Sequence, residues 1–501
     1  MKKIFSIFSV LAIAALSMFT VSCSSDEIIV SEPQQTADQT YNIRIPASFN
    51  EGSRAVSFDD GDDNTKGASK PMCEVFFYEK EKVYVYNATK KAMLTGNLYP
   101  SEISEDGKSC VLIGELTGTI EKGDELNLFY NLKYERRNAT NISFNYNSQN
   151  GLEGKVVDGA EAKLAVSDYS NGTLTTIGEA SFKILQSMFR FEFVDEKNDP
   201  VEKLVSLKVK SDNNALIRSY YPLKANYDGQ NKFDDYEIDN SKGLSGYIYT
   251  AIRIDEKKSA GDVLRFIAFD KDGNLYKGTK DAPKDGFKNG RYYYNSSAIN
   301  LTKYPLTKPE IEWINVKDED YMDGSYGPYY YTVYSPNNDK PIEFGISKNC
   351  NGYGFYVSSK SIIHLKDLTA IMFEKNINRF ILIYDDLNLD ITGENSIVFD
   401  KDVYDAYDAI PVQCDKLKLS GNGTLTVTSN KAENCGVLGI FNYNTKDPKS
   451  SNYNNYENTG ELDVSEQLAE EPEKTTVIRS ARTDNADGTY TWTYTVKPKE
   501  N

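Results

Sequence analysis

Histidine is almost absent from this chain, which has one, His364, in 501 residues. Zinc sites built from several histidines are therefore excluded. A catalytic dyad or triad that relies on histidine would have to use this single residue. In the segment SIIHLKDL it alternates with Ile363 and Leu365, which is the two-residue period of a strand. We therefore expect His364 to be a structural residue on one face of a strand.

Cysteine is also scarce, with six residues in the whole chain. Five of them lie beyond the N-terminal region and show no Cys-x-x-Cys spacing, namely Cys73, Cys110, Cys350, Cys414 and Cys435. The usual zinc and thioredoxin motifs are therefore excluded. Because five is an odd number, at least one thiol remains unpaired. A disulfide between Cys414 and Cys435 is left open.

Positive charge is in deficit as well. The 57 lysines and arginines are outnumbered by 74 acidic residues, giving a net charge of −17 and a pI of about 4.8. This balance argues against nucleic-acid binding, which needs a basic surface. Beyond the first 22 residues, no apolar run is long enough to cross a bilayer. The length indicates several domains, and a hydrophobic content of 39% is enough for packed cores.

The N-terminus carries an export signal. Lys2 and Lys3 precede an apolar run from Ile4 to Val21, and Ser22 is a small residue directly before Cys23. A basic start, an apolar centre and a small residue are typical of a secretory signal. An uncleaved membrane anchor is the alternative. The segment TVSC at residues 20–23 resembles a bacterial lipobox, which implies cleavage before Cys23 and acylation of its thiol.

Residues 23–40 are predicted to be an acidic, flexible tether, because they are rich in Ser, Glu, Gln, Thr and Asp. Asp26 and Glu27 stand close behind the lipidation site. Together with Ser24 and Ser25 they resemble the export tag that takes lipoproteins of some Gram-negative anaerobes to the outer face of the outer membrane. An ordinary polar tether is the alternative.

The rest of the chain is predicted to be all-β. The 36 tyrosines and 23 phenylalanines favour strands, and segments such as TYNIRIPASF alternate apolar and polar residues. We divide the chain into units at 41–175, 176–303 and 304–501. In ASFKILQSMFRFEFV the alternation changes parity near Gln186, which predicts a β-bulge there. The third unit has its own strands and is expected to fold without the first two.

Several segments in this order resemble the fimbrillin-like lipoproteins, which include fimbrial stalk, anchor and tip subunits. They are YNIRIPASF, ASFKILQSMFRFEFV and GRYYYNSSAINLTK, together with the lipobox and the tether. The resemblance implies two transthyretin-like β-sandwiches, over residues 41–175 and 176–303, and other fimbrial subunits as partners.

Stalk subunits of that family are trimmed by an Arg-specific protease, which frees a groove for a partner's strand. In this sequence Arg54, in GSRAVSF, stands at a matching place. We nevertheless expect the mature chain to begin at Cys23, because trimming after Arg54 would remove its own lipid anchor. The additional C-terminal unit also departs from a plain stalk subunit.

The third unit contains an internal repeat. LDITGENSIVF starts at Leu389 and LKLSGNGTLTV starts at Leu417, so that the second copy begins 28 residues after the first. A hairpin that occurs twice by chance is one interpretation. A parallel β-helix, in which each copy is part of a coil, is the one we prefer. The second copy resembles the carbohydrate-binding β-helix domains of secreted bacterial proteins. The fold is therefore expected to be two β-sandwiches followed by a short β-helix-like domain.

Two acidic segments are candidates for calcium. DKDGN, at residues 270–274, superficially resembles a calcium loop, but Leu275 stands where an EF-hand needs glycine, so we expect a turn. The other is a loop between the repeat copies that carries Asp400, Asp402, Asp405 and Asp408. Converging carboxylates suit calcium, which takes six to eight oxygen ligands. A solvated acidic loop and a catalytic carboxylate pair are the alternatives.

Tyrosine-rich segments are candidates for glycan binding, because aromatic faces stack on sugar rings while amides reach hydroxyls. DYMDGSYGPYYYTVY is one, with strand packing as its alternative. FNYNTKDPKSSNYNNYENTG is the better candidate, since it has too few aliphatic residues for a core. Its tyrosines are Tyr443, Tyr453 and Tyr456, and a mobile loop is the alternative.

These observations predict a non-catalytic lipoprotein of the cell surface, attached to the outer membrane through Cys23. A fimbrial or adhesin component is the function we favour. A surface protein that captures host or dietary glycans with its third unit is the alternative. A polysaccharide-degrading enzyme is disfavoured, because no catalytic constellation is positioned. Apart from calcium, no cofactor is expected.

Overall fold

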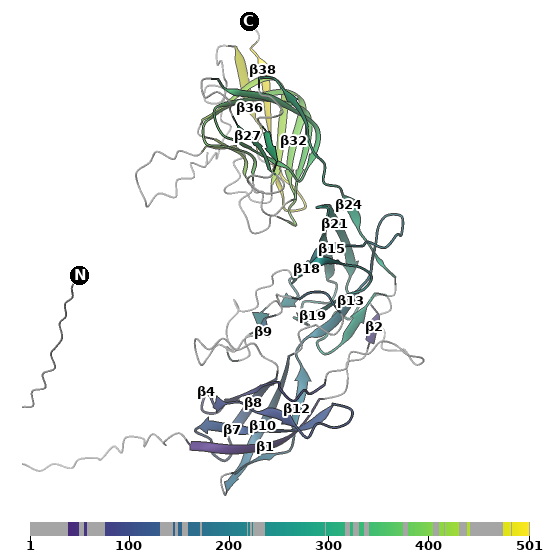
Figure 1. Ribbon diagram of the computed structural model, residues 1–501, viewed down its shortest axis with the longest axis vertical. Helices are drawn as coiled ribbons and strands as arrows, with labels where there is room; N and C mark the ends of the chain where they lie inside the picture. Colours follow the sequence, from purple (N-terminus) through teal and green to yellow (C-terminus); the bar gives the residue numbers. More distant parts are fainter. Residues whose placement is uncertain are drawn as a thin grey trace, which may run out of the picture.

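The computed structural model describes residues 39–49, 55–57, 76–130, 144–145, 149–152, 159–170, 173–217, 219–220, 223, 236–295, 297–315, 321–323, 330–334, 340–373, 379–403, 410–414, 416–429, 438–440, 474–481 and 483–499. Within these ranges every long regular element is a strand, as the sequence predicts. None of these residues forms a helix that could cross a membrane. Three β-rich units follow one another along the longest axis of the molecule (Figure 1).

The first unit is one ten-stranded sheet that closes around its own core. Its two ends meet where Val83 and Leu98 exchange backbone hydrogen bonds of 2.8 and 3.0 Å. The strands are β1 (Gln39–Phe49), β3 (Val83–Asn87), β4 (Ala92–Met93), β5 (Thr95–Gly96), β6 (Tyr99–Ser101), β7 (Ser109–Gly118), β8 (Glu125–Tyr130), β10 (Ala160–Ser170), β11 (Thr173–Ile177) and β12 (Ala180–Ile184).

Strand β1 lies inside this sheet, not at an edge. It pairs antiparallel with β7 on one side and parallel with β11 and β12 on the other. Its alternate side chains Tyr41, Ile43, Ile45 and Ala47 are buried in the core, as the alternating sequence predicts. The Tyr41 hydroxyl also donates to the Ile120 carbonyl at 3.2 Å. Strand β1 is therefore an integral part of this unit.

The chain leaves the first sheet after β12 and enters the second unit at β13 (Ser187–Phe191). The predicted boundary near residue 175 is therefore too early, because β12 still pairs with β1 and β10. The predicted bulge near Gln186 is also wrong. The apolar alternation changes parity there because one strand ends at Ile184 and the next begins in another sheet.

The second unit is a sandwich of two five-stranded sheets that share one core. Edge-to-face rings join the sheets, such as Phe191 and Phe266, whose centroids are 5.0 Å apart. One sheet contains β16 (Leu216–Ile217), β19 (Ile248–Ile254), β13, β22 (Tyr292–Tyr294) and β2 (Ala55–Ser57). The other contains β18 (Tyr236–Leu244), β15 (Leu204–Ser211), β20 (Val263–Asp270), β21 (Leu275–Asp281) and β24 (Thr302–Tyr304). Two short pairs complete the strands up to this point, β9 (Phe144–Asn145) with β17 (Ser219–Tyr220) and β14 (Phe193–Val194) with β23 (Ile299–Asn300).

The third unit, which we call the coil domain, winds through two sheets in turn. Parallel neighbours in one sheet are β28 (Ile342–Asn351), β30 (Ser361–Met372), β32 (Asp386–Phe399) and β34 (Lys416–Ser429). Parallel neighbours in the other are β27 (Tyr330–Val333), β29 (Gly354–Val357), β31 (Arg379–Ile383), β33 (Ile410–Cys414) and β35 (Leu438–Ile440). Successive strands therefore alternate between these two sheets along the chain.

Antiparallel strands flank the coils of the first of these sheets. They are β25 (Glu310–Trp313) beside β28, and β36 (Thr475–Arg479), β37 (Thr483–Asp484) and β38 (Tyr490–Pro498) beyond β34. Strand β26 (Tyr321–Asp323) flanks the second sheet.

The long strands of the coil domain bend at a column of residues with left-handed backbone. The φ angle is 63° at Lys348, 48° at Asp367, 71° at Gly393 and 103° at Gly421. Asn395, which is 3% exposed, ties neighbouring coils at this bend. Its side chain accepts the Leu368 N–H at 2.9 Å and donates to the Thr424 carbonyl at 3.2 Å.

The two copies of the repeat form neighbouring parallel strands, β32 and β34. The register that the sequence match predicts between them is wrong. The structure pairs Leu389 with Leu419 and Gly393 with Gly423, two positions beyond the match read from the sequence. The sequence match aligns Gly393 with Gly421, because each is the left-handed glycine of its copy. The left-handed glycine has shifted along the strand between these coils, so Gly393 faces Gly423 and Gly421 faces Ile391.

Candidate functional site

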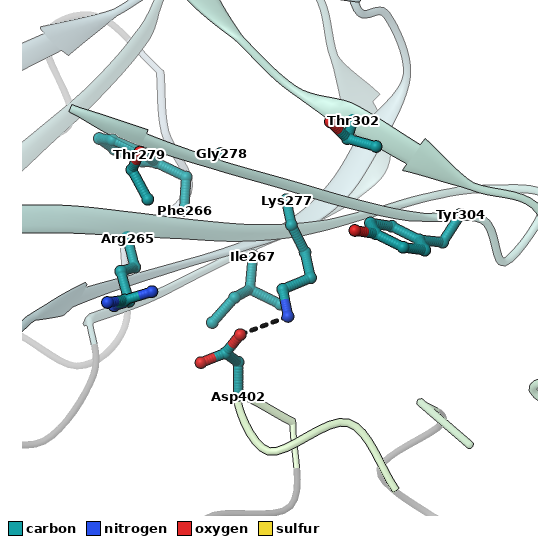
Figure 2. Close-up of a pocket in the computed structure, with 9 residues that line it drawn as sticks. All are labelled: Arg265, Phe266, Ile267, Lys277, Gly278, Thr279, Thr302, Tyr304 and Asp402. Atoms are coloured by element: carbon teal, nitrogen blue, oxygen red, sulfur yellow. Dashed lines mark ion pairs between the residues drawn. The ribbon is translucent and has the colours of Figure 1, made fainter. Parts of the chain in front are cut away.

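Among the described residues, a polar site lies where the second unit meets the coil domain. A pocket of about 190 Å³ opens there, lined by Arg265, Phe266, Ile267, Lys277, Gly278, Thr279, Thr302, Tyr304 and Asp402. All but the last come from β20, β21 and β24 of the second unit. Figure 2 shows that Asp402 reaches this sheet from the loop that follows β32, and that its carboxylate points at Lys277.

Lys277 is held by two carboxylates from the coil domain. Its Nζ donates to Asp400 Oδ2 at 2.9 Å and Oδ1 at 3.2 Å, and forms a second ion pair with Asp402. The side chains are 24%, 12% and 11% exposed for Lys277, Asp400 and Asp402. Partial burial opposes the ammonium charge, but the two carboxylates outweigh it and raise the pKa of Lys277. The lysine therefore remains charged.

Residues 400–403, which we call the junction loop, are pre-shaped for this contact. Asp400 Oδ1 accepts the N–H of Asp402 at 3.0 Å, and the Asp400 carbonyl accepts the N–H of Val403 at 3.1 Å. Lys401 points elsewhere and donates to the Asp487 carbonyl at 2.7 Å. The turn thus directs alternate side chains, Asp400 and Asp402, to the same lysine.

Two of the four aspartates that were candidates for calcium contact a lysine in the structure. Asp400 and Asp402 face Lys277, whereas Asp405 and Asp408 lie outside the described residues. Within the described ranges no group of three or more histidine, cysteine or acidic side chains could hold a metal ion. The two placed carboxylates therefore serve as partners of a lysine in this structure.

The single histidine lies on the outer face of β30, between carboxylates of the neighbouring coils. His364 Nδ1 is 2.9 Å from Asp390 Oδ2, and Nε2 is 3.0 Å from Glu343 Oε1. Partial burial lowers the pKa of His364, but the hydrogen bonds and charges of the two carboxylates raise it further, above its ordinary value. Ile363 and Leu365 point inward and are fully buried. His364 therefore lies on one face of a strand, as the sequence predicts.

This arrangement predicts a pH-dependent contribution to stability. A group whose pKa is raised by folding stabilises the fold fully below its unfolded pKa and loses that effect as pH rises through the folded value. We therefore expect wild type to melt higher than His364→Gln below pH 6.5, and the difference to fade as the pH rises above that value. Thermal melts from pH 5 to 9 test this. A difference that grows with pH would contradict it.

The cysteines within the described ranges are core residues. Cys110, Cys350 and Cys414 are 5%, 0% and 0% exposed. Burial raises the pKa of Cys110 and of Cys350 to about 12, which leaves both thiols protonated and unreactive at neutral pH. Cys435 lies outside the described residues, so the Cys414–Cys435 disulfide stays a prediction.

Other predicted site residues fall outside the described residues too. They are Cys23, Arg54, Tyr443, Tyr453 and Tyr456. In the first tyrosine-rich segment, Tyr330 and Tyr331 are 7% and 5% exposed and pack in the coil domain, whereas Tyr334 is 37% exposed. Tyr330 and Tyr331 therefore follow the alternative interpretation of that segment, which is strand packing.

The sequence gives no sign of the Lys277 site. Lys277 and Asp400 are separated by 123 positions and belong to different predicted units. Lys277 is one of many lysines on alternating strands, and only the docking of two units brings it to the junction loop. The acidic run around Asp400 is the one local sequence feature that points to a charged site here, and its composition indicates calcium binding and not a lysine partner.

Comparisons with known proteins leave the family open. No family model matches the chain, and no curated protein matches it. Among solved structures, a proposed cell adhesion protein from Bacteroides uniformis is 9% identical, with a TM-score of 0.27 over 52% of this chain and 97% of that one. Another from Bacteroides ovatus is 13% identical, with a TM-score of 0.26 over 53% and 96%. The SpaE basal pilin from Lactobacillus rhamnosus is 9% identical, with a TM-score of 0.15 over 54% and 93%. TM-scores this low assign the chain no family, so its own residues must carry the functional conclusion.

Proposed function

We propose that the chain is a non-catalytic surface lipoprotein that acts as a fimbrial or adhesin component. The observation that carries the proposal is the linear order of the units. The unit that begins with β1 lies at one end of the long axis, and the coil domain lies at the other (Figure 1). A lipid at Cys23 and the tether that follows would place the first unit near the membrane. The coil domain would then project outward, where a partner is met.

The predicted anchor is tested by replacing its acylated residue. Cys23→Ala is expected to abolish fatty-acid labelling and move the protein from the membrane to the soluble fraction, since each buried methylene of an acyl chain contributes about 0.8 kcal/mol to membrane binding. Fractionation of cells that express each variant measures this. Unchanged membrane partition of Cys23→Ala would refute the lipoprotein assignment.

A matched variant separates export from anchoring. Changing Asp26 and Glu27 to alanine keeps the thiol, so the protein should stay in the membrane fraction. If these acids act as an export tag, the variant becomes less accessible to protease added outside intact cells. Equal accessibility would make them part of an ordinary tether.

The role within an assembly depends on β1 and the segment after it. Arg54 precedes β2, whose residues Ala55–Ser57 pair with β22 of the second unit. Cleavage after Arg54 would therefore separate β1, together with the Cys23 anchor, from the rest of the chain, and would open a slot between β7 on one side and β11 and β12 on the other. That slot suits a partner's strand, which is the requirement for a stalk subunit. An intact β1 suits an anchor, an accessory or a tip subunit.

A further inference from the structure

We propose that Lys277 and the junction loop form an electrostatic lock that holds the second unit and the coil domain as one rigid body. The lock would fix the direction in which the coil domain projects. This inference concerns the mechanics of the chain and does not depend on the proposed surface function. It rests on a shared core, a fixed connection and a partly buried ion pair.

The shared core is the first observation. Ile267 and Leu275, from β20 and β21 of the second unit, are 2% and 0% exposed and belong to the same apolar cluster as the interior of the coil domain. The rings of Phe269 and Phe373 meet across the junction with centroids 6.4 Å apart. Separating the two units would expose these side chains to water, which is unfavourable.

The connection between the units is the second observation. Only residues 305–309 separate β24 from β25, and hydrogen bonds fix them on both sides. Leu306 N–H donates to Asn274 Oδ1 of the second unit at 3.0 Å. Thr307 and Asn351 of the coil domain exchange backbone hydrogen bonds of 3.2 and 3.0 Å. A connection tied to both units cannot act as a free hinge.

The ion pair supplies what apolar contact lacks, which is a preferred angle. Apolar packing is non-directional, so two apolar patches can slide over one another at small cost. Lys277 contacts both carboxylates of the junction loop only in one relative placement of the units. Because all three side chains are less than a quarter exposed, screening by water and salt is weaker than at the surface.

Arg265 is the other cation among the described residues that line this pocket, but its guanidinium pairs with Asp212 of the second unit through both Nε and Nη2. That pairing raises the pKa of Arg265, to which the nearby charge of Asp402 also contributes, but the guanidinium itself is engaged by Asp212. Without Lys277, Asp400 and Asp402 would lose the one cation that both contact among the described residues, and their mutual repulsion would push the loop off the sheet.

The experiment uses the full chain and compares Lys277→Met with wild type. Two readouts are measured, namely calorimetric unfolding and hydrogen exchange of the Leu306 and Thr307 amides. In wild type we expect the second unit and the coil domain to unfold in one transition. In Lys277→Met we expect two transitions, and about tenfold faster exchange at both amides, which corresponds to about 1.4 kcal/mol of lost local stability.

Three further variants make the result decisive. Lys348→Met removes a surface ion pair with Glu310, whose side chains are 69% and 60% exposed, and should change neither readout. Lys277→Arg keeps the charge and should restore most of the coupling. Asp400→Asn with Asp402→Asn removes the charges from the other side, so it should uncouple the units even if Lys277→Met folds poorly. Wild-type coupling and exchange in Lys277→Met and in the double variant would overturn the proposal.

Discussion

Gly393→Ala is expected to lower the free energy of unfolding of the coil domain by about 2–4 kcal/mol. Gly393 lies at the bend of β32 with φ of 71°, where an L side chain is strained. A Cβ at this position would also overlap Asp367 Oδ1 of the preceding coil. Turning Asp367 away would break the hydrogen bond in which that oxygen accepts the Glu394 N–H at 3.2 Å.

A second glycine, Gly488, distinguishes the cost of backbone strain from the cost of steric overlap. Gly488 lies in the turn before β38 and has φ of 82°, yet a Cβ there would meet no atom within 4 Å. Gly488→Ala therefore isolates the backbone cost, which we expect to be about 1 kcal/mol. Denaturant unfolding of both variants measures the difference. If both substitutions lower the free energy of unfolding equally, steric overlap with Asp367 makes no contribution at Gly393.

Deletion of residues 39–49 is expected to abolish the cooperative unfolding transition of the first unit. The deletion removes the buried side chains of Tyr41, Ile43 and Ile45. At about 1.5–3 kcal/mol for each large apolar side chain, their loss is comparable with the whole stability of a domain. It also leaves β7 on one side and β11 and β12 on the other with unpaired backbone groups.

A synthetic peptide with the sequence QTYNIRIPASF tests whether this slot accepts a strand. We expect it to restore the transition when added to the deleted protein, because main-chain pairing and alternate buried side chains supply the binding. A peptide with aspartate in place of Ile43 and Ile45 should fail, since it would bury two charges. A deleted protein that melts like wild type without peptide would contradict the role given to β1.

The sequence predicts the parts of the fold that depend on local pattern. Alternation in TYNIRIPASF correctly places Tyr41, Ile43 and Ile45 on the buried face. DKDGN is indeed a turn, in which Asp270 accepts the N–H groups of Asp272 and Asn274 at 2.9 and 3.0 Å. Such features need only neighbours along the chain, which is why periodicity and turn chemistry reveal them.

Features that depend on how units meet could not be predicted in this way. The repeat showed that two coils exist, but their register depends on where each strand bends. Ile267 reads as an ordinary core residue of the second unit, although it packs in the core of the coil domain. The same holds for Lys277, whose role depends on a loop from another unit. The third unit therefore shares part of its core with the second, and its independent folding stays a prediction.

The N-terminal residue of the mature protein is the measurement that tests the account most directly. Protein purified from the cell surface is digested, and its N-terminal peptide is identified by mass spectrometry. We predict a peptide that begins at Cys23 and carries fatty acids, with β1 still present in the same chain. A mature chain that begins at Ala55 would contradict the anchored role and would indicate a trimmed subunit whose first unit lacks β1.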